Sequence, residues 1–123
     1  MHLKNKRKSI SKATRRAVFE KYGGHCAYCG TEITMKTMQI DHLTPLVYAR
    51  FGVPNIDTTE NYMPACRSCN HYKSTLSLEK FRDMLERQPE ILARDSVTYR
   101  IAVRFGTVQP TPHKITFYFE KFQ

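Results

Sequence analysis

Three polar side chains in this sequence form a set that could hydrolyse a phosphodiester bond. Asp41 and His42 are adjacent, and Asn70 follows later in the chain. Carboxylate and amide oxygens are the ligands that Mg²⁺ and similar hard cations prefer. An imidazole titrates near neutral pH and can accept a proton from an attacking water. We therefore predict that Asp41 and Asn70 hold one catalytic divalent cation, Mg²⁺ or Mn²⁺, and that His42 is the general base.

The four cysteines form a second set, with two residues between the members of each pair. They are Cys26, Cys29, Cys66 and Cys69. Two such pairs can complete the tetrahedral ligand set of a structural zinc. The alternative is a set of buried thiols or disulfides. The 36 residues between the pairs exceed the roughly 15–20 of a simple zinc ribbon, so a sizeable insertion is expected there, and it contains Asp41 and His42.

The composition indicates one small domain with a basic N-terminus. The 123 residues contain no run that approaches the roughly 20 apolar residues of a membrane span. The N-terminus does not resemble a secretory signal, so we expect a reducing cytoplasm and no membrane partner. Residues 1–24 carry +7 of the formal net charge of +9. This surplus favours phosphate contacts by Lys8, Lys12, Arg15 and Arg16, although a solvated tail is the alternative and charge alone does not separate DNA from RNA or an anionic membrane.

The elements that position these side chains follow from capping residues and periodicity. We expect a basic arm over residues 1–10, a helix over 11–22 capped by Ser9 or Ser11, and a strand within 33–43. Such a strand would have to end or twist near Asp41 and His42, because adjacent residues point to opposite faces. A loop with one helical turn is expected over 44–60, and helices over about 69–74 and from Ser77 onward.

The C-terminal third alternates apolar and polar residues with a period of two. This alternation, over 97–105 and again over 115–119, predicts a β-hairpin with a loose connection. Arg100 and Arg104 would share its polar face, as a solvated surface or as a binding site.

Two segments also resemble the cysteine-bearing HNH endonucleases of the free-standing phage and bacterial type. The first is Gln-Ile-Asp-His-Leu-Thr-Pro over residues 39–45, and the second is Glu-Asn-Tyr-Met-Pro-Ala-Cys-Arg-Ser-Cys-Asn-His-Tyr-Lys over residues 60–73. The resemblance implies a small α+β domain with a ββα-metal, treble-clef-like core and a structural zinc on the four cysteines. We accordingly expect an arm (1–10), a nuclease core (11–90) and a C-terminal β-hairpin extension of the same domain (91–123).

The resemblance also implies roles for individual residues. Asp41 and Asn70 would hold the catalytic metal, His42 would be the general base, and Asn61 would orient the His42 ring. Lys73, on the same helical face as Asn70, would contact a phosphate. The position that is often histidine in the family is Asn70 here, a common variant, and His71 is expected to be a surface residue.

The function expected from this resemblance is metal-dependent cleavage of double-stranded DNA that leaves 5′-phosphate and 3′-hydroxyl ends. A homodimer, or association with phage packaging or restriction components, is expected by analogy. The alternative is a non-catalytic, zinc-stabilised module that binds nucleic acid or a partner protein. Such a module needs the cysteines and the basic arm but not Asp41, His42 and Asn70 together.

Overall fold

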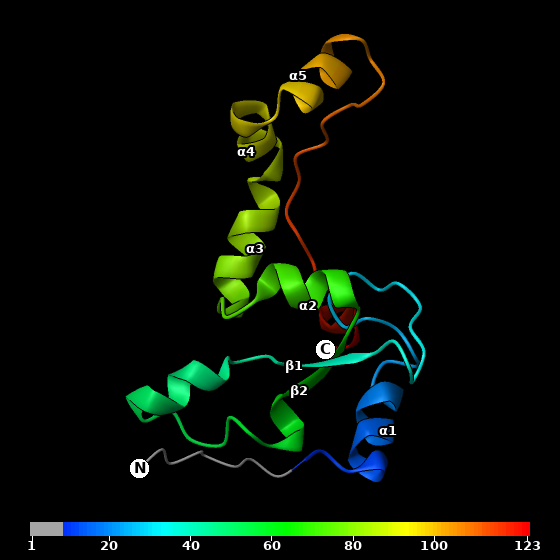
Figure 1. Cartoon of the computed structure of the whole chain (residues 1–123), viewed down its shortest axis with the longest axis vertical. Coiled ribbons are helices and arrows are strands. Elements are labelled where there is room, and N and C mark those ends of the chain that lie inside the picture. The colour runs from blue at the N-terminus through cyan, green and yellow to red at the C-terminus, as the bar shows by residue number, and fades with distance from the viewer. Residues whose placement is uncertain (1–8) are drawn as a thin grey trace, which may run out of the picture.

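The computed structural model of this protein describes residues 9–123, so Lys8 and most of the expected basic arm lie outside the described residues. A compact base holds the sheet and the first two helices, and a helical arm rises from it (Figure 1). In chain order the elements are α1 (Lys12–Glu20), β1 (Gln39–His42), the 3-10 helices η1 (Leu46–Phe51) and η2 (Thr59–Asn61), β2 (Tyr62–Ala65), α2 (Arg67–Lys73), α3 (Leu78–Glu86), α4 (Gln88–Asp95), α5 (Val97–Arg104) and η3 (Tyr118–Phe122).

The sheet has two antiparallel strands, β1 and β2, within the described part of the chain. Asp41 lies opposite Met63, and His42 lies opposite Tyr62. β1 is shorter than the expected strand and ends at His42. The chain is therefore a small α+β domain, as predicted, and its two adjacent polar residues lie where the strand stops.

Helix α1 begins as its sequence predicts. The Ser11 side chain accepts a hydrogen bond from the backbone N–H of Thr14, which satisfies one of the unpaired donors of the first turn. Val18 is fully buried on the inner face, where α1 packs against β2. Ser77 caps α3 in the same way, through the N–H of Lys80. None of the described helices has both the length and the apolar character needed to cross a membrane.

The C-terminal segment completes the core beside the first cysteine pair. Phe117 and Phe119 are buried, and Phe117 stacks on Phe81 of α3 with ring centroids 5.4 Å apart. The backbone N–H of Phe119 donates to Ala27, and the N–H of Tyr118 donates to Tyr28. These two hydrogen bonds fix the backbone of the turn between Cys26 and Cys29 to the C-terminal segment.

Two further contacts fix this closure. Gly30 has a φ of +81°, and a Cβ there would lie 2.6 Å from the Tyr118 ring, so both the backbone conformation and the space require glycine. Arg82 of α3 donates to both carboxylate oxygens of Glu120 at 2.8 and 2.6 Å. This bidentate pair holds the pKa of Glu120 below its usual range.

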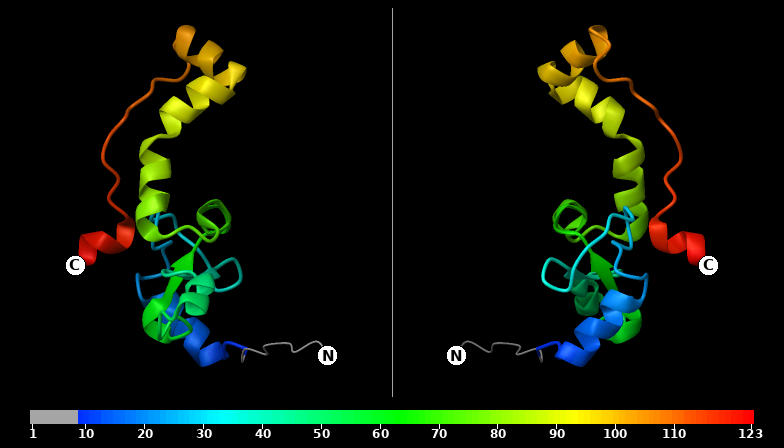
Figure 2. Two further views of the ribbon diagram at one scale, coloured as in Figure 1. Left: turned by 90° about the vertical axis from the view of Figure 1, so that its left-hand side faces the viewer. Right: turned by 90° about the vertical axis from the view of Figure 1, so that its right-hand side faces the viewer.

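The predicted C-terminal β-hairpin is wrong. Residues 97–104 form helix α5, which Ser96 caps through the N–H of Tyr99, and residues 118–122 form a 3-10 helix. The chain between them returns beside α3 and α4 as an extended segment without a strand partner among the described residues (Figure 2). The half-buried apolar residues of α5 are Tyr99, Ala102 and Val103, which are spaced as on one side of a helix, and the Ser96 cap favours the helix.

Candidate active site and metal centre

The four cysteine sulfurs converge on one point, as their spacing predicts. All four Sγ atoms lie within 4.8 Å of one another, and those of Cys29 and Cys66 are 3.9 Å apart. Ligands at about 2.3 Å from a tetrahedral zinc are themselves separated by about 3.8 Å. The donor set and its spacing therefore fit one structural zinc.

The electrostatics of the thiols also favour a cation. A hydrogen bond from Cys69 lowers the pKa of Cys26 to about 4. Burial raises the pKa of Cys29 to about 11, and the hydrogen bond to Cys26 raises the pKa of Cys69. Cys26 thus loses its proton easily, and its negative charge disfavours deprotonation of Cys29 and Cys69. A divalent cation removes this opposition, because it stabilises every thiolate that ligates it.

The cysteine site determines where α2 begins. Cys66 is the N-cap of α2, and its sulfur accepts a hydrogen bond from the N–H of Cys69 at 3.3 Å. The first cysteine pair is tied to β2, since the N–H of Ala27 donates to Pro64. The zinc ligands therefore join the sheet to the start of the helix that carries the polar residues of the second site.

Asp41 is held by two buried donors on the side of β1 that faces α2. Its Oδ2 accepts a hydrogen bond from the Tyr28 hydroxyl at 2.5 Å and forms an ion pair with Lys73 Nζ at 3.0 Å. The Lys73 side chain is fully buried, and Nζ also donates to the carbonyl of His42 at 3.0 Å. Burial, with the nearby Asp41 charge, raises the pKa of Tyr28, so its hydroxyl remains a donor.

Asn70 lies one turn before Lys73 in α2 and shares its side of the helix. Among the described residues its side-chain amide makes no hydrogen bond, and the bonds to the Asp41 carboxylate end on Oδ2. Within the described part of the chain, one carboxylate oxygen of Asp41 and the side-chain oxygen of Asn70 are thus not engaged in a hydrogen bond. Hard oxygen donors of this kind fit Mg²⁺, which commonly takes one or two carboxylates and keeps waters or substrate phosphates as its other ligands.

His42 faces the other side of the strand end. Its Nε2 lies 3.0 Å from Asp57 Oδ1, and its ring meets the Tyr62 ring edge-on at 5.2 Å between centroids. The Tyr62 hydroxyl donates to the same Asp57 oxygen at 2.7 Å. Asp57 was not anticipated from the sequence, because it lies in an irregular loop and no spacing signal connects it to His42.

Asn61 occupies a different position from the one expected of it. Its amide donates to the carbonyls of Thr44 and Ile56 at 2.9 and 2.7 Å, and its Oδ1 accepts from the N–H of Thr44 at 2.9 Å. It therefore closes the base of the loop that runs from His42 to Asp57. Asp57, rather than Asn61, lies 3.0 Å from His42 Nε2.

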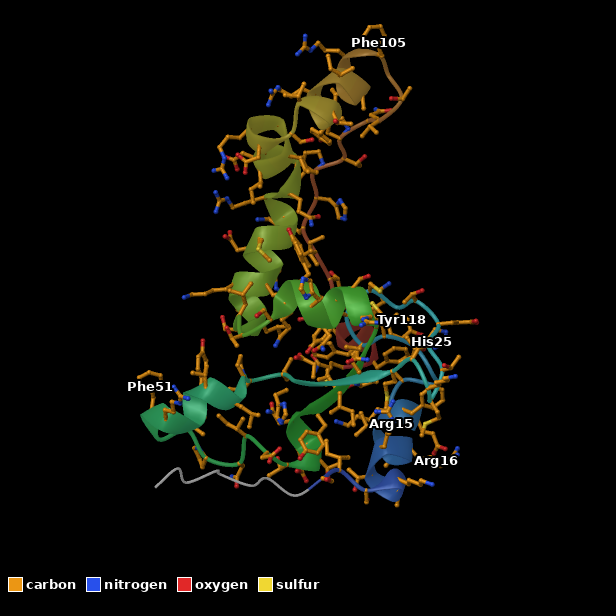
Figure 3. The ribbon with its side chains drawn as sticks, in the orientation of Figure 1. Arg15, Arg16, His25, Phe51, Phe105 and Tyr118 are labelled. Atoms are coloured by element: carbon orange, nitrogen blue, oxygen red, sulfur yellow. The ribbon has the colours of Figure 1, made fainter. Side chains whose placement is uncertain are left out.

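The basic side chains of α1 divide into two groups. Arg15 donates to the carbonyls of Met35 and Met38 at 2.5 and 2.7 Å, so its guanidinium is committed to the loop before β1. Lys12 is exposed, and the exposed Arg16 makes only a 3.9 Å pair with Glu20. Arg15 and Arg16 both lie on α1 (Figure 3), but only Lys12 and Arg16 keep their charges available to a partner.

Comparison with known proteins identifies the segment that holds these residues. Residues 26–75 match the family model described as HNH endonuclease. A CRISPR-associated endonuclease Cas9 of Corynebacterium diphtheriae is 40% identical over 48 residues, which is 39% of this chain and 4% of the relative. A crystal structure of the Type II-C Cas9 enzyme from Actinomyces naeslundii is 30% identical, with a TM-score of 0.49, over 63% of this chain and 8% of that one.

The chain thus spans a small fraction of the length of either relative. The matched segment nevertheless contains both cysteine pairs, Asp41, His42, Asn61, Asn70 and Lys73. The resemblance to HNH endonucleases that was inferred from the sequence is confirmed.

Loss of zinc is expected to unfold the base of the molecule, because a structural site contributes folding free energy directly. Cys66→Ser should bind less zinc, measured by elemental analysis, and should lose the cooperative thermal transition seen by circular dichroism. Ser68→Ala, in the same turn but without a ligand, is the control and should keep both. A Cys66→Ser protein that melts like Ser68→Ala without zinc would contradict the assignment.

Lys73→Met is expected to destabilise the fold by about 3–5 kcal/mol, because it leaves the Asp41 carboxylate buried without its cation. Urea unfolding measures this, with Lys80→Met on the exposed start of α3 as a control expected within about 0.5 kcal/mol of wild type. Adding Asp41→Asn to Lys73→Met should recover part of the loss, because the double variant buries no unpaired charge. Equal unfolding midpoints for the two lysine variants would show that the pair contributes nothing.

Proposed function

We propose, from the match of residues 26–75 to the HNH endonuclease family, that this protein is a metal-dependent DNA endonuclease that hydrolyses phosphodiester bonds. One observation carries the proposal: Lys73 of α2 is bonded both to Asp41 and to the carbonyl of His42, which ties the helix that carries Asn70 to the end of β1. We assign Asp41 and Asn70 to the catalytic Mg²⁺ or Mn²⁺, and the nuclease core to residues 11–90.

His42 acts as the general base in this proposal. A carboxylate at Nε2 favours the tautomer with the proton on that nitrogen, so Nδ1 is the basic nitrogen. Nδ1 takes the proton of a water that attacks the phosphorus, while the Nε2–H bond to Asp57 keeps the ring in place and stabilises the charge that the ring gains. Asp57 is therefore a positioning residue for His42.

Asp41 and Asn70 present their oxygens from the opposite side of the strand end. A divalent cation held there supplies Lewis-acid stabilisation of charge on the phosphoryl and leaving oxygens. His42 and Asp41 diverge from adjacent positions, so a phosphate lying across the end of β1 meets the base on one side and the oxygen ligands on the other. An in-line displacement, in which the attacking and leaving oxygens lie on opposite sides of the phosphorus, would need such a separation of the base from the cation ligands.

Lys73 and Asn61 support this chemistry from a distance. Lys73 is fully buried and bonded to Asp41 and to the carbonyl of His42, so we assign it the orientation of Asp41 in place of the phosphate contact expected from the sequence. Asn61 fixes Thr44 and Ile56, and through them the loop that delivers Asp57.

Double-stranded DNA is the proposed substrate, and the family resemblance implies 5′-phosphate and 3′-hydroxyl ends. The exposed Lys12 and Arg16 would contact phosphates without reading bases, as would Lys8 outside the described residues. The relative from Corynebacterium diphtheriae is described as a CRISPR-associated endonuclease, which also supports a nucleic-acid substrate. One catalytic set per chain cuts one strand per encounter, so a double-strand break requires a second copy or successive nicks.

A zinc-stabilised module that binds nucleic acid without cutting it is the second candidate. The Lys73–Asp41 ion pair favours it, because the proposed metal ligand already has a buried cation 3.0 Å away. The two candidates differ in one property, the cleavage of DNA on addition of a divalent cation.

Incubation of supercoiled plasmid with Mg²⁺ or Mn²⁺ tests the proposal. Wild type should nick or linearise the plasmid, and His42→Ala should slow cleavage by about 10²–10⁴-fold, the usual contribution of a general base. Asp41→Ala and Asn70→Ala should reduce cleavage through loss of the cation. Asp57→Ala should lower kcat while KM changes little, because Asp57 acts through His42.

His71→Ala, on the exposed side of α2, is the matched control and should cleave like wild type. Cleavage that survives both His42→Ala and Asp41→Ala would overturn the assigned site. A gel shift without cleavage in either metal would favour the binding module.

A further inference from the structure

The loop over residues 43–56 is fixed at both ends to the proposed catalytic histidine. It begins directly after His42 and leads into Asp57, whose carboxylate lies 3.0 Å from His42 Nε2. Its base is closed by the Leu43 N–H, which donates to Asn61, and by the side-chain bonds of Asn61. The loop that carries the tip is therefore tied at its base to His42.

The tip presents an aromatic ring to solvent. Phe51 ends η1 and is 79% exposed, and Gly52 reverses the chain after it at a φ of +82° with its N–H bonded back to Tyr48 and Ala49. A Cβ at Gly52 would meet no atom within 4 Å, so the turn stands clear of the rest of the fold. Figure 3 shows Phe51 at the outer end of η1.

The charge of the loop favours a nucleic acid as the partner of this ring. Residues 43–56 contain one basic residue, the exposed Arg50 beside Phe51, and no Asp or Glu. Aromatic side chains next to positive charge stack on bases of any sequence in single-stranded nucleic acid, and apolar side chains can also wedge between base steps of a duplex.

We propose that Phe51 stacks on an unpaired or unstacked DNA base next to the cut phosphate, while Arg50 contacts the backbone. This inference rests on the proposed function, because it takes the position of the cut from His42. The proposed stacking contact would recognise a base, whereas the available basic residues of α1, Lys12 and Arg16, are proposed to contact phosphates alone. The loop then directs the nuclease towards DNA that is single-stranded or distorted at the cleavage site.

Phe105 provides a matched control. It is also 79% exposed, but it follows α5 at the far end of the helical arm formed by α3, α4 and α5 (Figure 3). It also follows an exposed arginine, Arg104, so the two rings are matched in neighbouring charge as well as in exposure. Removal of either ring takes similar exposed apolar surface from the protein, yet only Phe51 lies on the loop tied to His42.

The test measures DNA binding without added Mg²⁺ or Mn²⁺, so that it does not depend on cleavage. The probe is a labelled duplex with a single-stranded flap and 2-aminopurine at the junction. Phe51→Ala should weaken binding by about 5–150-fold, the range of one lost base–aromatic stack, and should abolish the fluorescence change of the 2-aminopurine. Phe51→Trp should restore both, and Phe105→Ala should match wild type.

Equal affinity of Phe51→Ala and wild type for the flap probe, or an equal loss in Phe51→Ala and Phe105→Ala, would overturn the base contact. The two proposals fail separately. If binding depends on Phe51 but the protein never cleaves DNA, the endonuclease proposal is wrong and the base contact is supported. If Phe51→Ala cleaves the flap probe with an unchanged KM, the endonuclease proposal is supported and the base contact is wrong.

Discussion

The structure depends first on the convergence of four cysteine sulfurs. Two tight turns, one before the sheet and one at the start of α2, bring these atoms within 4.8 Å of one another. A small two-stranded sheet and a seven-residue helix have little intrinsic stability, so a metal bound by the four cysteines would add stability to their packing. The C-terminal segment adds a second constraint by covering the first turn with Tyr118 and the buried Phe119.

The consequence of this constraint is a polar site at the end of β1. Lys73 of α2 reaches Asp41 and the carbonyl of His42, and Asn70 lies one turn earlier in the same helix. The end of the strand allows the adjacent Asp41 and His42 to face different sides. The proposed cation ligands and the proposed general base are thereby separated, which suits a substrate that lies across the surface.

Much of this arrangement could be predicted from local sequence signals. The cysteine spacing, the Ser11 and Ser77 caps and the strand that ends near Asp41 all follow from chemistry that acts over a few residues. The C-terminal hairpin does not form, although residues 97–105 alternate as a strand does, because the Ser96 cap favours a helix there. Asp57 could not be predicted, because its contact with His42 arises from closure of an irregular loop by Asn61. The commitment of Arg15 to two backbone carbonyls before β1 is likewise a tertiary contact without a sequence signal.

One metal is thus expected to hold the fold, and a second is expected to lie beside His42. Anomalous diffraction from crystals of the protein with bound DNA and Mn²⁺, collected at the zinc and manganese edges, tests both parts together. The predicted result is a zinc peak among the sulfurs of the four cysteines and a separate manganese peak between the side-chain oxygens of Asp41 and Asn70. A map with manganese elsewhere, or with Lys73 still bonded to Asp41 and no manganese at that position, would contradict the two-metal arrangement.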